Sequence, residues 1–289
     1  QIAKNTSKDD LVIFLISGGA SALLCSPLDG INFFEKQKIN NELLKSGASI
    51  DEMNIVRQSI SAVKGGRLLE LIKPSNCITY GISDIPGDDP SFIGSGPTIY
   101  SNNDPNKLFE ILDNYQIKIS KEILSIIKTN LLPKGINENF HLIASPMKAL
   151  KAASNLAKKI GFLPIILSDK LEGDASKEGE RMANLALKIK KEKRYKNISL
   201  EKPILLLSGG ETTVKVNGLG KGGRNSEFAL SMVNTLKGNK NILGLSIDTD
   251  GIDGSEDNAG AFFSYETFLK SKKLNLDIKK YINNNDAFS

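Results

Sequence analysis

The chain contains 289 residues with 38 lysines and arginines against 33 aspartates and glutamates, which gives a formal net charge of +5. One histidine and two cysteines exclude a zinc finger, a disulfide framework and a Cys/His metal cage. The small charge and a 6% aromatic content argue against nucleic-acid binding. Apolar runs such as residues 11–16 are too short to span a bilayer, and Asp9 and Asp10 directly before that run argue against a signal peptide. We therefore expect a cytoplasmic protein with small-molecule partners and with neither nucleic acid nor membrane as a partner.

Short β-type runs alternate with helical patterns along the chain, which predicts an α/β fold with mostly parallel sheets. The expected strands cover residues 11–16, 77–82, 141–144, 164–167, 203–207 and 242–247. The expected helices cover residues 33–46, 51–63, 105–115, 121–131, 146–160 and 174–190. The strands read as near-continuous Val/Ile/Leu runs, as expected of strands that are covered on both faces.

The length predicts about two domains. A polar stretch without apolar periodicity, residues 191–201, gives the expected boundary. We place a Rossmann-like α/β domain at residues 1–197 and a second α/β domain at residues 198–289. Because the chain starts with Gln1 rather than Met and stops within what reads as an element, we expect a fragment that is incomplete at both ends.

Five Gly-rich or acidic turns follow expected strands or helices, and in an open parallel sheet such turns gather at the edge where ligands bind. In the first turn, Ser17, Gly18 and Gly19 offer backbone N–H groups that suit an anion at the start of a helix. A tight turn that needs glycine only for its backbone conformation explains these residues equally well. Both interpretations stay open at this point.

The second turn is the segment 64–67, Lys-Gly-Gly-Arg, which lies between two helical segments. A helix C-cap followed by a restart explains the glycine pair best on its own. The flanking cations would also suit a phosphate or a carboxylate. Asn54 and Arg57, one helical turn apart on the preceding helix, can join the same polar surface.

The third turn is acidic: Asp84, Asp88 and Asp89 lie within six residues of one another after the second expected strand. Carboxylates packed this closely repel one another unless a cation offsets them, and oxygen ligands in a loop suit Mg²⁺. A solvated, Asp-rich turn is the alternative. The segment then ends in a second possible anion-binding turn, which contains Ser95, Gly96 and Thr98.

The fourth turn spans residues 208–227, where Gly218, Gly220 and Gly223 satisfy the pattern G-x-G-x-x-G. The match is weak evidence for a dinucleotide site, because the segment follows a hairpin-like strand rather than opening a clean βαβ unit. Lys221 and Arg224 are better interpreted as phosphate contacts. The Walker A pattern is absent, because no Gly-Lys-Ser or Gly-Lys-Thr occurs.

The fifth turn spans residues 248–261 and resembles a calcium-binding EF-hand loop only superficially. Ala259 stands where the bidentate glutamate should be, so we reject calcium and expect a second acidic turn at a strand end. Basic Gly-rich turns and acidic turns would thus meet at one sheet edge without histidine or cysteine. Phosphoryl transfer needs this combination of positioning groups, cations and Mg²⁺, with little covalent chemistry from the protein.

Six segments in order resemble the two-domain glycerate kinases, which pair an N-terminal domain of unknown-function designation with a C-terminal MOFRL domain. The segments are SGGASALL (17–24), NIVRQSISAVKGGRL (54–68), SDIPGDDPSFIGSGPT (83–98), LLSGGETTV (206–214), GKGGRNSEFAL (220–230) and TDGIDGSEDNAGA (249–261). The resemblance implies ATP- and Mg²⁺-dependent phosphorylation of D-glycerate, usually to 2-phosphoglycerate, in a cleft between two α/β domains. The sequence departs from the family pattern at three positions. Ala20 stands where the family usually has a third glycine, Gln58 where a basic residue is usual, and Asp248 where glycine is commoner.

The resemblance and the turn chemistry together give the expected site. The expected catalytic residues are Lys64, Arg224, Asp84 and Asp250, and the expected metal ligands are Asp88, Asp89 and Asp253. The expected substrate- and nucleotide-binding residues are Ser17, Gly18, Gly19, Asn54, Arg57, Gly65, Gly66, Ser95, Gly96, Thr98, Ser208, Gly209, Gly210, Glu211, Gly222, Gly223, Asn225 and Glu227.

Two other functions stay open. Some members of the family carry the label hydroxypyruvate reductase, and the G-x-G-x-x-G match would suit NADH or NADPH in such an enzyme. A non-catalytic module that binds a sugar acid or a nucleotide is the third possibility. A homodimer is also possible.

Overall fold

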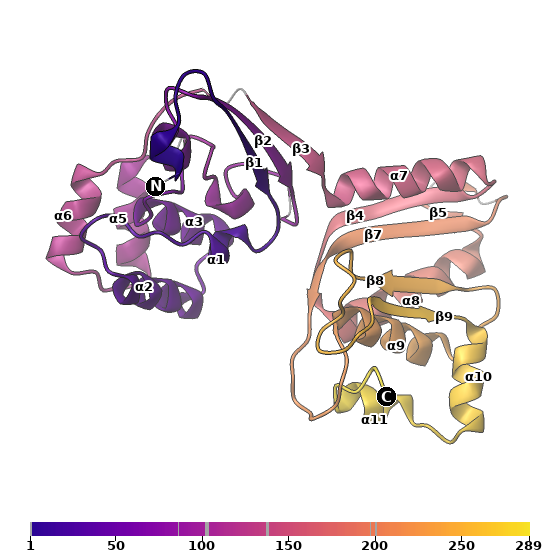
Figure 1. Cartoon of the computed structure of the whole chain (residues 1–289). Coiled ribbons are helices and arrows are strands. Elements are labelled where there is room, and N and C mark those ends of the chain that lie inside the picture. Colours follow the sequence, from indigo (N-terminus) through magenta and orange to yellow (C-terminus); the bar gives the residue numbers. More distant parts are fainter. Residues whose placement is uncertain (1, 86, 102–103, 137–138, 197, 200) are drawn as a thin grey trace. The chain divides into compact units, whose positions relative to one another are not determined.

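The computed structural model describes residues 2–85, 87–101, 104–136, 139–196, 198–199 and 201–289 (Figure 1). The chain divides into two compact units, Gln1–Ala149 and Leu150–Ser289. Among the helices of the described residues, none is long and apolar enough to cross a membrane.

Unit 1 is built on a parallel sheet of three strands, β1 (Leu11–Ile16), β2 (Asn76–Ile82) and β3 (Phe140–Ala144), in the order β1-β2-β3. The register aligns the first residue of β1 with that of β2, and Ile16 pairs with Gly81. Both β1 and β2 therefore end at the same edge of the sheet, which brings the turns that follow them together.

The longer helices of unit 1 begin close to where the sequence pattern predicts. The bounds of the helices in this unit are η1 (Ile2–Asn5), α1 (Ala20–Leu23), α2 (Phe33–Ser46), α3 (Ile50–Ser59), α4 (Arg67–Leu71), η2 (Ile93–Ser95), α5 (Pro105–Asn114) and α6 (Lys121–Thr129). Reciprocal capping boxes start α2 at Asn32 and α3 at Ser49. The helix predicted over residues 51–63 ends earlier, at Ser59, because Ser61 forms a bridge with Pro27.

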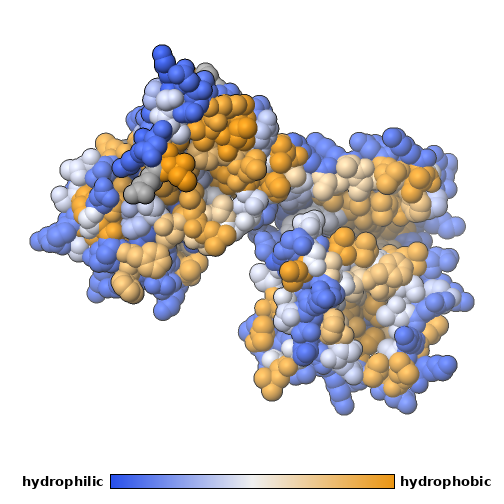
Figure 2. All heavy atoms as spheres, viewed as in Figure 1, coloured by the Kyte–Doolittle hydropathy of each residue, from blue (hydrophilic) through white to orange (hydrophobic). Residues whose placement is uncertain are grey.

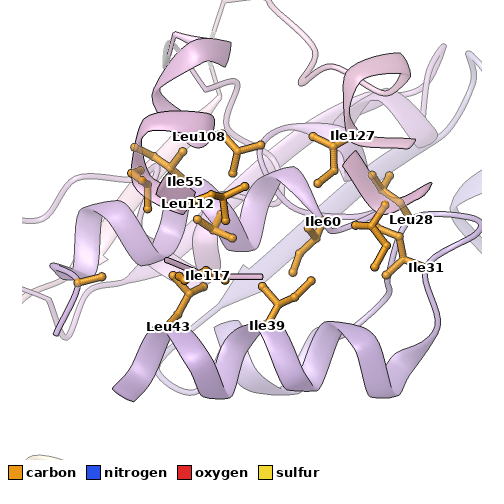
Figure 3. Packing of buried hydrophobic residues seen from close by; sticks show 14 residues of the cluster. Leu28, Ile31, Ile39, Leu43, Ile55, Ile60, Leu108, Leu112, Ile117 and Ile127 are labelled. Atoms are coloured by element: carbon orange, nitrogen blue, oxygen red, sulfur yellow. The ribbon is translucent and has the colours of Figure 1, made fainter. Parts of the chain in front are cut away.

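The core of unit 1 lies among its helices. Ile39 and Leu43 point from α2 toward Leu112 and Ile117 (Figure 3). Burial of such aliphatic side chains contributes roughly 1.5–3 kcal/mol each. This cluster holds α2 and α3 in place, and α3 carries two of the expected site residues.

The sheet of unit 1 is covered on one face only within the described residues, so the prediction of strands covered on both faces is wrong for β1. Burial alternates along β1, and Leu15 is 79% exposed, with Leu11 and Ile13 exposed beside it. Figure 2 shows a hydrophobic patch where Figure 1 draws β1 and β2. A run of apolar residues predicts a strand, but it does not show whether one or both faces of that strand are covered by other elements.

Unit 2 contains parallel and antiparallel pairs. The strands β4 (Leu163–Asp174) and β7 (Ile204–Thr213) pair in parallel, and β8 (Gly244–Ile247) pairs with β9 (Gly260–Phe263) antiparallel. A short antiparallel pair joins β5 (Arg194–Tyr195) and β6 (Ile198–Ser199). The helices are α7 (Pro146–Lys159), α8 (Ala175–Glu192), α9 (Arg224–Leu236), α10 (Tyr265–Lys273) and α11 (Ile278–Asn283). A core around Ala229 and Val233 of α9 and Phe263 of β9 holds this unit together.

The division between the two compact units falls within α7, between Ala149 and Leu150, and not at the expected boundary between residues 197 and 198. Residue 197 lies outside the described residues. The reason for the different boundary is the pairing of β4 with β7, which runs from Leu163–Ile204 to Asp174–Thr213. Because α8 also packs against α9, residues before the polar stretch 191–201 share a core with residues after it.

Candidate functional site

A cavity of about 140 Å³ lies in unit 1 at the edge where β1 and β2 end. Its wall combines the turn after β1, one face of α3 and the acidic turn after β2. The lining residues are Ser17, Gly18, Gly19, Ala20, Ser21, Ile50, Asn54, Arg57, Asp84, Ile85, Phe92 and Gly94. The structure thus brings together six of the expected residues: Ser17, Gly18, Gly19, Asn54, Arg57 and Asp84.

Two glycines make the turn after β1 possible. Gly19 has φ 77° and stands as the N-cap of α1, a left-handed conformation that favours glycine. A Cβ on Gly18 would lie 2.5 Å from Oδ2 of Asp84. Gly18 therefore lets the turns after the two neighbouring strands approach each other closely, which explains why a glycine-rich segment and an acidic segment share one wall.

Lys64 is only 2% exposed and lies directly beneath this wall. Its ammonium donates to the backbone oxygen and hydroxyl of Ser21, and it lies 3.4 Å from the Ser95 hydroxyl. Ser95 in turn donates to Oδ1 of Asn54 at 2.9 Å. Burial, together with the smaller effect of the charges of Lys36 and Arg57, lowers the pKa of Lys64 to about 8.

Two arginines of unit 1 differ in what surrounds them. Arg57 is one of the residues that line the cavity, its guanidinium makes no hydrogen bond within the described part of the chain, and burial lowers its pKa. Arg67 donates to the backbone oxygens of Gln58 at 2.6 Å, Ser61 at 2.7 Å and Asn130 at 2.6 Å. Burial lowers the pKa of Arg67 to about 10. Arg67 fastens three chain segments, so the phosphate contact considered for it from the sequence is replaced by a structural role.

The glycine pair after Lys64 also has a structural explanation. Gly65 and Gly66 have φ values of 60° and 84°, and their N–H groups donate to the backbone oxygens of Ser95 and Gly96. A Cβ on Gly66 would lie 2.7 Å from the ring of Tyr100. These amides join two loops and are not available to the anion expected there.

The second expected anion-binding turn is only partly at the site. Ser95 reaches Lys64, as described above. The Gly96 N–H donates to Ile93 O at 3.0 Å, and the buried Thr98 hydroxyl accepts a hydrogen bond from Thr79 at 2.8 Å. Gly96 and Thr98 therefore stabilise the loop and the sheet rather than offering groups to a ligand.

The acidic turn places its carboxylates in different environments. Asp84 lines the cavity. Oδ1 of Asp89 accepts hydrogen bonds from the backbone N–H and the hydroxyl of Ser91, both at 2.8 Å. Asp88 has φ 57°, and its Oδ1 is buried without a partner in the described residues. No three Asp, Glu, His or Cys side chains among the described residues come together as a metal cage, so these carboxylates fit only a Mg²⁺ that also takes ligands from a substrate.

In unit 2, the start of α9 is capped by Asp253, which is fully buried. Its carboxylate accepts from the N–H of Asn225 at 2.8 Å and from the N–H and hydroxyl of Ser226 at 2.7 and 2.6 Å. A carboxylate at this position satisfies the first free N–H groups of the helix and its dipole. These contacts give Asp253 a structural role in place of the metal role expected from the sequence.

Arg224, the first residue of α9, is held by two carboxylates. Its Nε and Nη2 donate to Oδ2 of Asp248 at 3.0 and 2.6 Å, and its Nη1 donates to Glu211. Burial alone would lower the pKa of Arg224, but these bonds outweigh burial and raise it. The structure therefore brings together Arg224 and Glu211, two of the expected site residues, and adds Asp248 as a partner of Arg224.

Residues Ser208, Gly209 and Gly210 do not form a turn, because β7 continues through them to Thr213. A Cβ on Gly210 would lie 2.2 Å from the backbone nitrogen of Leu171 on β4. The prediction of a second Ser-Gly-Gly turn after a strand is therefore wrong; the glycine here permits close strand pairing.

The remaining expected residues lie around the loop before α9. Gly222 has φ 136°, and a Cβ on Gly223 would lie 2.3 Å from the backbone of Asp253. Asp250 is exposed and accepts from the N–H of Ile252 at 2.9 Å. Glu227 is buried, which raises its pKa, and it accepts a hydrogen bond from Asn285 at 3.1 Å.

The glycines of the G-x-G-x-x-G pattern pack against the end of the chain. A Cβ on Gly218 would lie 2.2 Å from the backbone oxygen of Asn284, and one on Gly220 would lie 2.3 Å from Cβ of Asp286. Asn285 also accepts hydrogen bonds from the N–H groups of residues 217 and 218. This loop is shaped for chain packing, which argues against a dinucleotide site there.

Sequence reasoning missed Ser21, Ile85 and Phe92 in the cavity wall, and it missed Lys36, whose charge acts on Lys64. Ser21 belongs to the quoted SGGASALL segment, so its position beside Ser17 was the available signal. Lys36 lies in a helix rich in lysine and glutamate, where nothing in the sequence distinguishes a buried cation from an exposed one.

Comparisons with known proteins bear on this geometry. Residues 1–128 match a family described as a domain of unknown function, DUF4147, and residues 204–289 match the MOFRL family. The chain is 37% identical to the D-glycerate 2-kinase of Thermotoga maritima and 33% identical to a glycerate 2-kinase of Pyrococcus horikoshii. These alignments cover 100% and 99% of this chain and 68% and 66% of the relatives. An Agrobacterium vitis protein with a provisional hydroxypyruvate reductase name is 40% identical over 99% of this chain and 74% of its own length.

Solved structures agree with these relatives. The crystal structure of Thermotoga maritima glycerate kinase superposes with a TM-score of 0.87 over 99% of this chain and 68% of that chain, at 37% identity. A Pyrococcus horikoshii protein superposes with a TM-score of 0.79 over 99% of this chain and 67% of that chain, at 33% identity.

Proposed function

The chain belongs to the family of MOFRL-type glycerate kinases, and from this premise we propose that it transfers the γ-phosphoryl group of ATP to D-glycerate, giving 2-phosphoglycerate. Phosphoryl transfer requires a site that positions a hydroxyl and offsets developing negative charge. The observation that carries the proposal is the cavity of unit 1, where Asp84 and Arg57 share a wall above the ammonium of Lys64.

We assign Lys64 and Arg57 to charge stabilisation in unit 1. The Lys64 ammonium is fixed by Ser21, so it requires no rearrangement when negative charge approaches the cavity wall. A charge that is already oriented in a poorly solvated site contributes more than one in water. Arg57 has no competing hydrogen bond in the described residues and can donate directly to an anion in the cavity.

We assign Arg224 to the phosphate chain of ATP, with Glu211 and Asp248 holding its guanidinium in place. When bound, Mg²⁺ would neutralise phosphate charge, and Asp84 and Asp88 are the carboxylates that fit it, one at the cavity and one with a buried oxygen that lacks a partner. Asp84 also lies where it can orient the hydroxyl of the substrate.

Phosphorus NMR of a reaction with D-glycerate, ATP and Mg²⁺ tests the proposal, because it identifies the phosphorylated hydroxyl as well as the turnover. Removing one charged contact in Lys64→Met or Arg224→Met should lower kcat by roughly 10²–10³-fold. Lys73→Met, an exposed lysine paired with Glu70, is the matched control and should keep its activity. Full turnover in both site variants would contradict the assigned roles, and a product phosphorylated at the 3-hydroxyl would contradict the proposed regiochemistry.

The hydroxypyruvate reductase alternative has one observation in its favour, the name of the Agrobacterium vitis relative. Against it stand the glycines of its expected nucleotide loop, which pack against residues 284–286. Calorimetry with NADH and with ATP–Mg²⁺ separates the two activities. Binding of NADH without binding of ATP would favour the reductase.

A further inference from the structure

Residues 284–286 hold the loop that connects β7 with α9. The N–H of Leu219 donates to Oδ1 of Asn284 at 3.3 Å, and the N–H of Lys221 donates to Oδ1 of Asp286 at 3.2 Å. The glycines of this loop lie so close to the same segment that a Cβ would collide with it. A loop that is fastened at successive residues has little freedom to change its backbone conformation.

Asn285 makes the central contacts of this clamp, by which we mean residues 284–286 and their hydrogen bonds to the loop. Its Oδ1 accepts hydrogen bonds from the N–H groups of Asn217 at 2.7 Å and of Gly218 at 2.9 Å. Its Nδ2 donates to Oε2 of Glu227 at 3.1 Å and to the backbone oxygen of Lys215 at 3.2 Å. Because both ends of the side-chain amide have partners of the matching kind, its orientation is determined, and it holds the peptide between residues 217 and 218 in one orientation.

Asn217 and Gly218 form the single Asn-Gly pair in the sequence. The Asn217 side chain is exposed, and its amide makes no hydrogen bond within the described residues. Asparagine is thermolabile, because the backbone nitrogen of the next residue can attack its side-chain carbonyl carbon and close a succinimide ring. Glycine as the next residue favours the attack, since it has no side chain to hinder the approach. Here the attacking atom is the nitrogen of Gly218, whose N–H is bound by Asn285.

We propose that Asn217 is a deamidation site that Asn285 keeps closed in the folded chain. For the ring to form, the nitrogen of Gly218 loses its proton and bonds to Cγ of Asn217, and the side-chain nitrogen leaves as ammonia. Water then opens the ring at either carbonyl, which leaves aspartate or isoaspartate, so water is the only co-reactant. Asn285 opposes the first step, because its Oδ1 retains the Gly218 proton and fixes the peptide that would have to turn.

The reaction would record each opening of the clamp permanently. Isoaspartate adds a carbon atom to the main chain in a loop where neither Gly218 nor Gly220 has room for a Cβ. The modified loop therefore cannot restore its contacts with residues 284–286. This loop leads directly to Arg224 at the start of α9, so the damage would lie next to the charged cluster of unit 2.

Peptide mass spectrometry of the whole chain, incubated at mildly alkaline pH, measures the rate of deamidation at Asn217 in the folded state and in urea. The folded chain should react at least about tenfold more slowly than the unfolded chain, because hydrogen bonds must break first. In the folded state, Asn285→Ala should react about tenfold faster than the unmodified chain. Equal rates in the folded and unfolded chain would overturn the proposal, as would equal rates with and without Asn285. Formation of aspartate without isoaspartate would contradict the succinimide route.

Two further variants separate the clamp from overall stability. Asn283→Ala removes an exposed asparagine at the end of α11 and should leave the rate unchanged. Val233→Ala weakens the core of unit 2 but keeps residues 284–286, so it should lower stability in urea denaturation with little effect on the rate. An acceleration in Val233→Ala equal to that in Asn285→Ala would show that overall stability protects Asn217 and would overturn the role of Asn285. These rates are independent of the proposed kinase activity.

Discussion

The cations of unit 1 and those of unit 2 are balanced in different ways. In unit 2, Arg224 is held by Asp248 and Glu211, and the N-terminal amides of α9 are occupied by Asp253. In unit 1, neither Lys36 nor Arg57 forms an ion pair among the described residues, Lys36 interacts with the side chain of Cys25, and Lys64 contacts only neutral oxygens. Arg224 in unit 2 thus has carboxylate partners within the chain, whereas the buried cations Lys36, Arg57 and Lys64 of unit 1 have none among the described residues.

This difference indicates which unit offers an anionic ligand the larger gain in electrostatic binding free energy. An anion that enters unit 1 relieves charge repulsion and desolvation that the folded chain already carries, so binding is favoured by electrostatics prepared in advance. An anion that approaches α9 must compete with Asp253 for the same amides. We therefore expect the backbone of residues 222–225 to contribute less to phosphate binding than its glycine-rich sequence predicts.

The largest effect on stability should come from Asp253→Ala. It removes a buried carboxylate that accepts hydrogen bonds from Asn225 and Ser226 and leaves their groups unsatisfied, at a cost of about 3–5 kcal/mol of unfolding free energy. Urea denaturation measures the change. Asp250→Ala, an exposed neighbour, should stay within about 0.5 kcal/mol. A similar, small loss in both variants would show that α9 does not depend on this internal anion.

The next effect concerns Arg67, the one arginine of unit 1 whose guanidinium donates to three backbone oxygens. Arg67→Met should lower the unfolding free energy by about 2–4 kcal/mol, because the oxygens of Gln58, Ser61 and Asn130 lose a charged donor. Arg181→Met removes an exposed pair with Glu178 and serves as the control, with a loss under about 1 kcal/mol. An equal loss of unfolding free energy in Arg67→Met and Arg181→Met would show that Arg67 contributes no more to stability than an exposed surface charge.

A pH effect should come from Lys64, whose pKa is lowered to about 8 from 10.5. Between these two values the unfolded chain holds a proton that the folded chain has released, so stability rises with pH over this window. Relative to Lys64→Met, the unmodified protein should gain on the order of 1–3 kcal/mol between pH 8 and pH 10. Parallel stability curves for the two proteins would contradict the burial of an uncompensated charge.

The smallest effect should come from the partners of Arg224. Asp248→Asn keeps the shape of the side chain but weakens two charge-assisted bonds, and the unfolding free energy should fall by about 1 kcal/mol. Glu211 is 61% exposed, so Glu211→Gln should change stability by less than about 0.5 kcal/mol. A larger effect of Glu211→Gln than of Asp248→Asn would reverse the assignment of the principal partner.

Sequence patterns predicted most of the secondary structure because its signals are local. The bounds of α2 match the prediction, since Asn32 and Glu35 cap the helix from within four residues. The continuation of β7 through Ser208–Gly210 could not be predicted from local sequence. Glycine is required at Gly210 because the backbone of β4, about forty residues earlier in the chain, lies too close for a side chain. A glycine-rich segment has the same local sequence whether it forms a turn or lies in a closely paired strand.

The candidate site was predictable as a set of residues but not as a set of roles. Asp84 and the Ser17–Gly19 turn line one cavity, as their positions after parallel strands suggested, and Arg57 of α3 lines the same cavity. Asp253, Gly65 and Gly66 were assigned to ligands, yet their groups are used by the chain itself. Asp248 stood out in the sequence only as a departure from a glycine, and its bond to Arg224 depends on the tertiary placement of β8 beside α9.

The central claim, that buried cations of unit 1 are compensated by a bound anion, is tested most directly by the titration of Lys64. Carbon-13 NMR of lysine side chains, assigned with Lys64→Met, gives the pKa of its ammonium with and without D-glycerate. We expect a midpoint of about 8 without ligand and an upward shift of about one unit or more when a carboxylate enters the cavity. An unchanged midpoint at saturating D-glycerate would contradict the account.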